Sequence, residues 1–201
     1  MHLSLTSMLV LFGCAACQGA APASAPPAAP APPPASSAPL QDKRAELAPP
    51  TAPAAIAVPG QQQVRLKLRG KGVQIYGCRA KPGAGEAFEW ALVAPEAELF
   101  DDAGKAVLKH SAGPTWESTD GSRVVGKLEA KADAPEATAI PWLLLSAKPS
   151  GTGMLSHVSY VQRVDTQGGK AAPAGCDALH ADAEQRVEYS ATYYFYEPQS
   201  E

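Results

Sequence analysis

The sequence contains no asparagine and therefore no acceptor site for N-linked glycosylation. It also lacks Asp, Glu, Lys and Arg before Asp42, so the formal net charge of -3 belongs to the residues from Asp42 onward. That part of the chain is mildly acidic and has no basic cluster, which argues against a nucleic-acid partner. The apolar stretch at the start ends at Gly13 and is shorter than the about 20 residues that a transmembrane helix requires.

The usual signatures of catalysis and metal binding are missing too. The histidines available for catalysis, His110, His157 and His180, do not stand in His-x-His or His-x-x-x-His spacing, so no local element supplies two metal ligands. No Gly-x-Ser-x-Gly motif marks a hydrolase serine. Residues 121–127 fit most of a phosphate-binding loop, but Leu128 follows where that motif needs Ser or Thr. We therefore expect no cofactor; a zinc or copper site assembled from distant residues is the alternative.

What the chain does have at its start is an apolar run that ends in small residues and a cysteine. Leu11 stands three residues before Cys14 and Gly13 directly before it, which resembles the processing site of lipid-modified bacterial precursors. Cys14 is the predicted acylated residue, and Cys17, preceded by two alanines, is the alternative. The start carries no Lys or Arg, which departs from that pattern, so an ordinary cleaved signal peptide is the second interpretation.

These features predict three regions: a signal segment over residues 1–17, a disordered Ala/Pro-rich linker over 18–59 and a β domain over 60–201. The linker has no apolar period, and proline favours an extended chain, so it can hold the domain up to roughly 100 Å from its anchor. We expect the protein at the bacterial cell envelope, attached to the outer membrane by its lipid. A secreted or periplasmic protein is the alternative.

Two cysteines remain in the third region, Cys78 and Cys176. In an exported protein such a pair most simply forms a disulfide, and two free thiols are the alternative. The loop that it would close is about 100 residues long, for which the chain-entropy model gives a stabilisation of about 4 to 5 kcal/mol. No Cys-x-x-Cys and no adjacent histidine in this region indicate a metal site instead.

Alternation of apolar and polar residues predicts β-strands along the third region. Over residues 186–196 the odd positions are apolar and the first even positions polar, which is the period of a strand with one buried face. Residues 123–131 alternate likewise, apart from one valine. A third pattern begins over residues 64–68 but continues on the opposite parity at 73–75. We therefore expect a bulge or a turn at residues 70–72.

Two further segments define the expected fold. The continuous apolar run 140–145 predicts a strand buried on both faces, with Pro141 at its beginning or on an edge. The pair Asp120-Gly121 predicts a hairpin, and a three-residue loop would place Trp116 and Val124 on the same face. No stretch of about twelve residues has a helical stripe. The sequence therefore predicts an all-β domain, a single β-sandwich or closed barrel of roughly eight to ten strands.

The candidate ligand surface consists of residues whose side chains suit binding: His110, Trp116, Asp120 and Arg163. Trp116 lies near the predicted turn and is the tryptophan best suited to an exposed position, where its ring could stack on a sugar; we expect Trp90 and Trp142 in the core. Arg163 interrupts an apolar run, so it either pairs with an internal carboxylate or faces water at an edge. Asp120 is otherwise a simple turn residue.

Five distinctive motifs follow one another in order along the chain: Gly72–Cys78, Gly113–Ser122, Ala139–Leu145, Tyr160–Val164 with Gly168-Gly169, and Tyr193–Tyr196. Together they resemble the domain of unknown function 3455 family, which comprises exported proteins of bacteria and filamentous fungi. The resemblance extends from about Val64 to Tyr196. It implies export, a single domain and importance for Cys78 and Cys176. It implies no activity and supplies no catalytic residues.

The sequence leaves the molecular function open between two classes. The first hypothesis is a non-catalytic, lipid-anchored β domain with a binding or surface-structural role, for an envelope ligand such as a glycan. The second is an extracellular enzyme, a hydrolase or a metal-dependent one, whose site is assembled from distant residues such as the four named above. Convergence of those four side chains in one pocket favours the enzyme, whereas dispersal over the surface counts against it.

Overall fold

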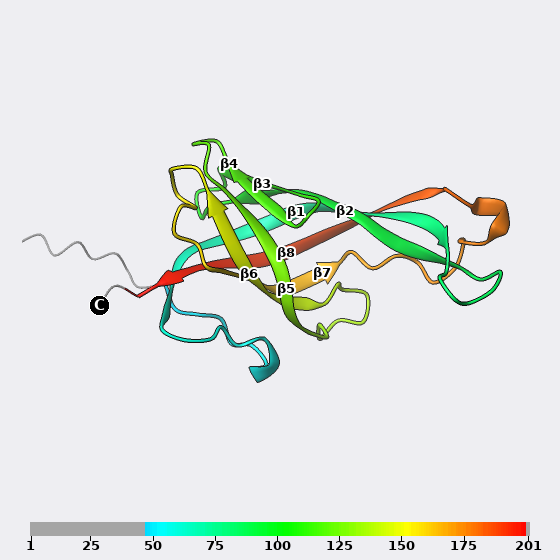
Figure 1. Cartoon of the computed structure of the whole chain (residues 1–201), viewed down its shortest axis with the longest axis horizontal. Helices are drawn as coiled ribbons and strands as arrows, with labels where there is room; N and C mark the ends of the chain where they lie inside the picture. The colour runs from blue at the N-terminus through cyan, green and yellow to red at the C-terminus, as the bar shows by residue number, and fades with distance from the viewer. Residues whose placement is uncertain (1–46, 200–201) are drawn as a thin grey trace, which may run out of the picture. The chain divides into compact units, whose positions relative to one another are not determined.

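The computed structural model describes residues 47–199, in which eight antiparallel strands close into one barrel (Figure 1). Strands that follow one another in the chain are neighbours in the sheet, and β8 pairs with β1 to close the ring. The strands are β1 (Gln62–Ala80), β2 (Phe88–Phe100), β3 (Ala106–Ser111), β4 (Thr115–Ser118), β5 (Arg123–Ala132), β6 (Trp142–Ser150), β7 (Tyr160–Gly168) and β8 (Glu184–Pro198). The predicted all-β fold is confirmed, and the structure selects the barrel over the sandwich.

Helix is confined to two short 3-10 turns, η1 (Ala54–Ile56) and η2 (Ala178–His180), within residues 47–199. Neither turn is long and apolar enough to cross a bilayer.

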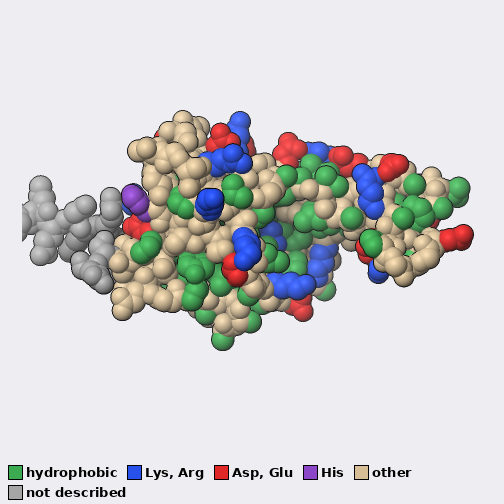
Figure 2. Space-filling model, viewed as in Figure 1, with side chains coloured by type: hydrophobic (Ala, Val, Ile, Leu, Met, Phe, Trp, Pro, Cys, Tyr) green, Lys and Arg blue, Asp and Glu red, His purple; other side chains and the backbone are tan. Residues whose placement is uncertain are grey.

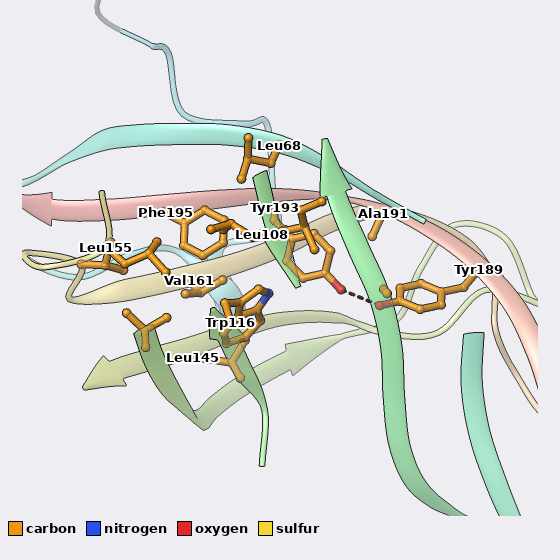
Figure 3. Packing of buried hydrophobic residues seen from close by; sticks show 14 of the residues in the cluster. Leu68, Leu108, Trp116, Leu145, Leu155, Val161, Tyr189, Ala191, Tyr193 and Phe195 are labelled. Atoms are coloured by element: carbon orange, nitrogen blue, oxygen red, sulfur yellow. Dashed lines mark hydrogen bonds between the residues drawn. The ribbon is translucent and has the colours of Figure 1, made fainter. Parts of the chain in front are cut away.

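The barrel interior is filled by large side chains from alternating positions of β8. Tyr189, Ala191, Tyr193 and Phe195 all belong to the main hydrophobic cluster, in which Tyr193 and Phe195 are 0% exposed (Figure 3). The hydroxyl groups of Tyr189 and Tyr193 lie 3.0 Å apart and hydrogen-bond to each other. The period of two in the sequence therefore predicted the inward face of this strand correctly.

The expected turn or bulge at residues 70–72 is wrong. Strand β1 runs without interruption through this stretch, and Gly70 and Gly72 lie on its inward side. A Cβ atom on Gly70 would lie 2.6 Å from Cε2 of Tyr193, so the position has no room for a side chain. The irregularity in this strand occurs at Arg65, opposite β8, and it places Val64 and Leu66 on opposite faces.

Strand β6 is buried on both faces, as its continuous apolar sequence predicted. Leu145 belongs to the cluster inside the barrel, whereas Leu144 packs in a second cluster outside it, against Tyr194. Pro141 stands directly before Trp142, the first residue of the strand. A proline at this place removes no hydrogen bond from the ladder.

The predicted hairpin at Asp120-Gly121 joins β4 to β5. Trp116 pairs with Val124 across the two strands, so both side chains point to the same face, as expected from a three-residue loop. Both side chains are buried in the main cluster, Trp116 with 1% and Val124 with 0% of its surface exposed. The turn therefore sets the register that directs Trp116 into the barrel.

Residues 47–58, which we call the outer segment, pack on the outside of the barrel. Ile56 is 0% exposed and contacts the outer cluster around Leu144 and Tyr194. The Nε2 group of Gln162 donates a hydrogen bond of 2.8 Å to the Ile56 carbonyl oxygen. The expectation that the disordered linker continues to residue 59 is therefore wrong for this part, because one isoleucine among alanines and prolines suffices to cover an apolar patch. Cys14 and Cys17 lie outside the described residues.

A disulfide joins Cys78 of β1 to Cys176, 98 residues further along the chain. The Cα atoms of the two residues are 5.3 Å apart. The backbone of Cys78 is also tied to the segment before β8, because its N–H donates to the Ala183 carbonyl oxygen at 2.8 Å and its carbonyl oxygen accepts from the Asp182 N–H at 3.0 Å. The predicted pairing of these two cysteines is confirmed.

Candidate functional site

A pocket of about 340 Å³ lies where the wall of the barrel is incomplete. The pairing of β2 with β3 ends at Ala97 and His110, and β3 then turns into β4, so residues 88–96 of β2 have no paired strand on that side within the described part of the chain. The pocket is lined by this free part of β2, by the turn at residues 112–114, by Ile140 and Pro141, and by side chains of all seven other strands. Early termination of one ladder thus creates the opening.

One wall of the pocket is a stack of aromatic rings. The rings of His110 and Trp116 are parallel within 4°, with centroids 4.4 Å apart. Tyr193 meets both rings edge to face, at 5.6 Å from His110 and 5.9 Å from Trp116. Gly126 leaves room for the ring of Trp116, because a Cβ atom on residue 126 would lie 3.0 Å from Cζ3 of Trp116. Figure 3 shows Trp116 beside Tyr193 inside the barrel.

His110 is held in its neutral form. Burial lowers the pKa of His110 from 6.5 to about 4, the hydrogen bond to the Thr115 carbonyl opposes that shift, and the Arg163 charge adds to it. Nδ1 lies 2.9 Å from the Thr115 carbonyl oxygen, and since a carbonyl only accepts, Nδ1 carries the proton. Nε2 therefore presents a lone pair, and the ring contributes no positive charge at neutral pH.

Arg163 places a guanidinium group inside the barrel. It lies in β7 between Leu143 of β6 and Tyr193 of β8, and it is 9% exposed. Its Nη2 donates a hydrogen bond of 2.8 Å to the carbonyl oxygen of Pro141. Within residues 47–199 no ion pair includes Arg163. Both sequence interpretations, an internal carboxylate partner and a water-facing edge, are therefore wrong; the residue follows the inward parity of Val161 in the same strand.

Three buried nitrogen atoms of the pocket lining have no hydrogen-bond partner: Nε2 of Gln74, Nε1 of Trp116 and Nε of Arg163. Gln74 is 2% exposed and lies in β1 opposite Pro95. A buried polar group without a partner costs about 1–3 kcal/mol, so three together in one cavity call for an explanation. They are the donors that a bound molecule would satisfy.

The mouth of the pocket is apolar. Leu92, Val93 and Leu128, which we call the lip, are 57%, 57% and 51% exposed, and all three line the pocket. Val93 is the extra residue of a bulge in β2 opposite Ile75 and Tyr76. The sequence placed Leu128 and Ala130 on one face; a bulge between them puts Ala130 on the outer face instead and leaves Leu128 at the mouth.

The structure brings together three of the four residues nominated from the sequence and separates the fourth. Asp120 does not line the pocket. Its carboxylate accepts hydrogen bonds from Ser122, through both N and Oγ, and from the Met154 N–H at 2.8 Å. These hydrogen bonds, the Ser122 hydroxyl first, hold the pKa of Asp120 below its usual range. Through its hydrogen bond with the Met154 N–H, Asp120 connects the loop that contains Met154 to the β4–β5 hairpin.

The tryptophans differ from the sequence expectations. Trp116 is buried rather than exposed, because its inward register in β4 outweighs its closeness to the turn. Trp90 and Trp142 are half-buried and lie outside the main core: Trp90 donates from Nε1 to the Ala174 carbonyl oxygen at 3.2 Å, and Trp142 packs against the outer cluster.

Sequence reasoning missed Gln74 and Tyr193 as parts of the site. Gln74 carried one usable signal: it continues the inward parity of Leu68 and Gly70 in β1. Tyr193 was assigned to the inward face of its strand, but nothing local distinguishes a pocket wall from a packed core. In residues 47–199 no group of three or more His, Cys, Asp or Glu side chains is arranged to hold a metal ion.

The fold and the site define an eight-stranded antiparallel β-barrel with a laterally open, mostly apolar pocket. A comparison with family models matches residues 59–197 to the family described as Protein of unknown function (DUF3455), and the chain belongs to that family. Neither the curated proteins nor the solved structures include a match to this chain.

Proposed function

We propose that the protein is an exported, lipid-anchored binding protein whose barrel pocket holds one small, largely apolar molecule. The observation that carries this proposal is the set of three unpartnered N–H donors in a cavity that reaches the surface through an apolar lip. Its volume of about 340 Å³ lies within the usual range of ligand pockets. Eight strands give a barrel whose interior can hold one small ligand.

Binding explains the lining better than catalysis does. No Ser, Thr, Cys, Lys, Asp or Glu is among the described residues that line the pocket, so His110 has no Ser, Thr or Cys nucleophile and no carboxylate partner there. The convergence of His110, Trp116 and Arg163 is the observation that favours the rival proposal, an extracellular hydrolase. A glycan is a poorer fit than an apolar molecule, because Trp116 is 1% exposed and stacks on His110.

The anchor that we propose is a lipid on Cys14, with Cys17 as the alternative residue, and the location is the outer membrane; secretion or a periplasmic location is the alternative. The disulfide between Cys78 and Cys176 supports an oxidising compartment. Metabolic labelling with a fatty acid tests the anchor. Label that persists after replacement of both Cys14 and Cys17 would contradict it.

Titration calorimetry with octanol, a neutral amphiphile, tests binding in the pocket. We expect saturable binding of one molecule per chain. The variant Leu92→Ser removes part of the lip and should weaken binding about tenfold, which corresponds to the burial of a few methylene groups. Leu179→Ser is the matched control, because Leu179 is 92% exposed and does not line the pocket. Failure of octanol, octanoate and octylamine alike to bind, or equal effects of the two variants, would overturn the proposal.

A further inference from the structure

We infer that the molecule in the pocket is an organic monocarboxylate whose carboxylate pairs with Arg163 and whose apolar body lies against the lip. This inference rests on the proposed function and adds the chemical class of the ligand.

The unpartnered atoms are all donors. Nε2 of Gln74, Nε1 of Trp116 and Nε of Arg163 each carry N–H groups and cannot accept. The complementary ligand must therefore bring acceptors. An ionised carboxylate has two oxygen atoms that accept about four hydrogen bonds and donate none. An alcohol brings one acceptor oxygen and an ammonium group brings none, so each satisfies fewer of these donors.

The pocket also carries one positive charge without a counter-charge. Arg163 is the only Arg or Lys among the described residues that line it, no Asp or Glu lines it, and His110 is neutral at neutral pH. A buried charge without a partner is costly, and a guanidinium fork matches a carboxylate in geometry. On the face shown in Figure 2, basic and acidic side chains are interspersed.

A single charge fits a monoanion. A phosphate monoester carries close to two negative charges at neutral pH, and here it would leave one of them unpaired in an apolar cavity. The rest of the ligand meets Leu92, Val93 and Leu128, three of the five exposed large hydrophobic residues of the described chain. Their gathering at one opening indicates an apolar body that passes from the cavity to the lip.

Titration calorimetry at neutral pH with four ligands of equal chain length tests the inference: octanoate, octanol, octylamine and octyl phosphate. We expect octanoate to bind at least tenfold more tightly than octanol, octylamine to bind most weakly, and octyl phosphate to bind no more tightly than octanoate. Arg163→Met keeps an unbranched apolar stem in the place of the arginine stem and removes the charge, so octanoate should fall to the affinity of octanol. Arg163→Lys keeps the charge without the fork and should retain part of the preference.

The outcomes separate the inference from the proposed function. Equal binding of octanol and octanoate by the wild type would contradict the inference that the ligand is a carboxylate. It would not contradict the proposal that the pocket binds a small apolar molecule. Tighter binding of octyl phosphate assigns the site to phosphate esters and overturns the inference as well. A preference for octanoate that survives Arg163→Met shows that another group selects the anion. Should Arg163→Met fail to fold, as circular dichroism would show, Gln74→Leu removes one donor and should weaken octanoate binding more than octanol binding.

Discussion

His110 is a titratable side chain placed where its charged form is disfavoured. It is 3% exposed, and burial, opposed by the Thr115 hydrogen bond and assisted by Arg163, lowers its pKa from 6.5 to about 4. The folded protein therefore binds the His110 proton more weakly than the unfolded chain does, and protonation favours unfolding. The resulting stabilisation is complete above about pH 6.5 and is lost as the pH falls toward about 4.

We expect a change from about pH 7 to about pH 5 to lower the free energy of unfolding by about 2 kcal/mol more in the wild type than in His110→Gln. The variant has no titrating ring, so its difference from the wild type isolates His110 from the carboxylates. Urea unfolding at the two pH values measures the effect. The control is His157→Gln, which replaces an exposed histidine. The same pH dependence in the wild type and in His110→Gln would refute the prediction.

At the scale of the element, the outer segment is a folded part of the chain whose Ala/Pro-rich composition predicted disorder. Its central residue, Ile56, closes the outer cluster over Leu144, Val164 and Tyr194. The hydroxyl of Tyr196 donates to Gln162 Oε1 at 2.8 Å, and Gln162 in turn holds the Ile56 carbonyl, so the contact is both apolar and hydrogen-bonded.

The variant Ile56→Ala should destabilise the β domain by about 2–4 kcal/mol, because it removes a fully buried side chain. Thr51→Ala, in the same segment but exposed, should change the free energy of unfolding by less than about 0.5 kcal/mol. Chemical unfolding of both variants provides the comparison. If Ile56→Ala proves as stable as Thr51→Ala, the outer segment does not contribute to the stability of the barrel.

The strands differ in how well the sequence predicts which of their side chains face the barrel interior. In β8 the alternation holds from Arg186 to Tyr193, so the inward face could be assigned residue by residue. In β1 the inward positions Gly70, Gly72 and Gln74 are small or polar, and Val73 and Ile75 are apolar on the outside, so hydrophobicity indicated the wrong face. The inward orientation of Arg163 and Gln74 was not predicted for the same reason: a polar residue in a strand is expected to face water unless its neighbours fix the parity.

At the scale of the whole molecule, closure of the ring brings the site together. Gln74, His110 and Arg163 come from β1, β3 and β7, and no short-range pattern relates them. The pocket depends on the β1–β8 pairing and on the early end of the β2–β3 ladder, both of which are set by long-range contacts. The sequence could therefore predict the fold class and part of the residue set, but not the cavity.

The disulfide acts at the same scale, because it links positions 98 residues apart. Replacement of both Cys78 and Cys176 by serine should lower the free energy of unfolding by about 2–5 kcal/mol, since the unfolded chain regains the freedom of a long loop. Urea unfolding with and without a thiol reductant measures the loss. The reductant should destabilise the wild type by the same amount and leave the double variant unchanged; an unaffected wild type would argue against the constraint.

The stacking of Trp116 on His110 has an optical consequence. Trp90 and Trp142 lie outside the barrel interior, so Trp116 is the one indole in residues 47–199 that lines the pocket. Its fluorescence depends on what occupies the cavity and on the charge of the ring stacked against it at 4.4 Å. The barrel thus contains its own spectroscopic probe of occupancy, which needs no attached dye.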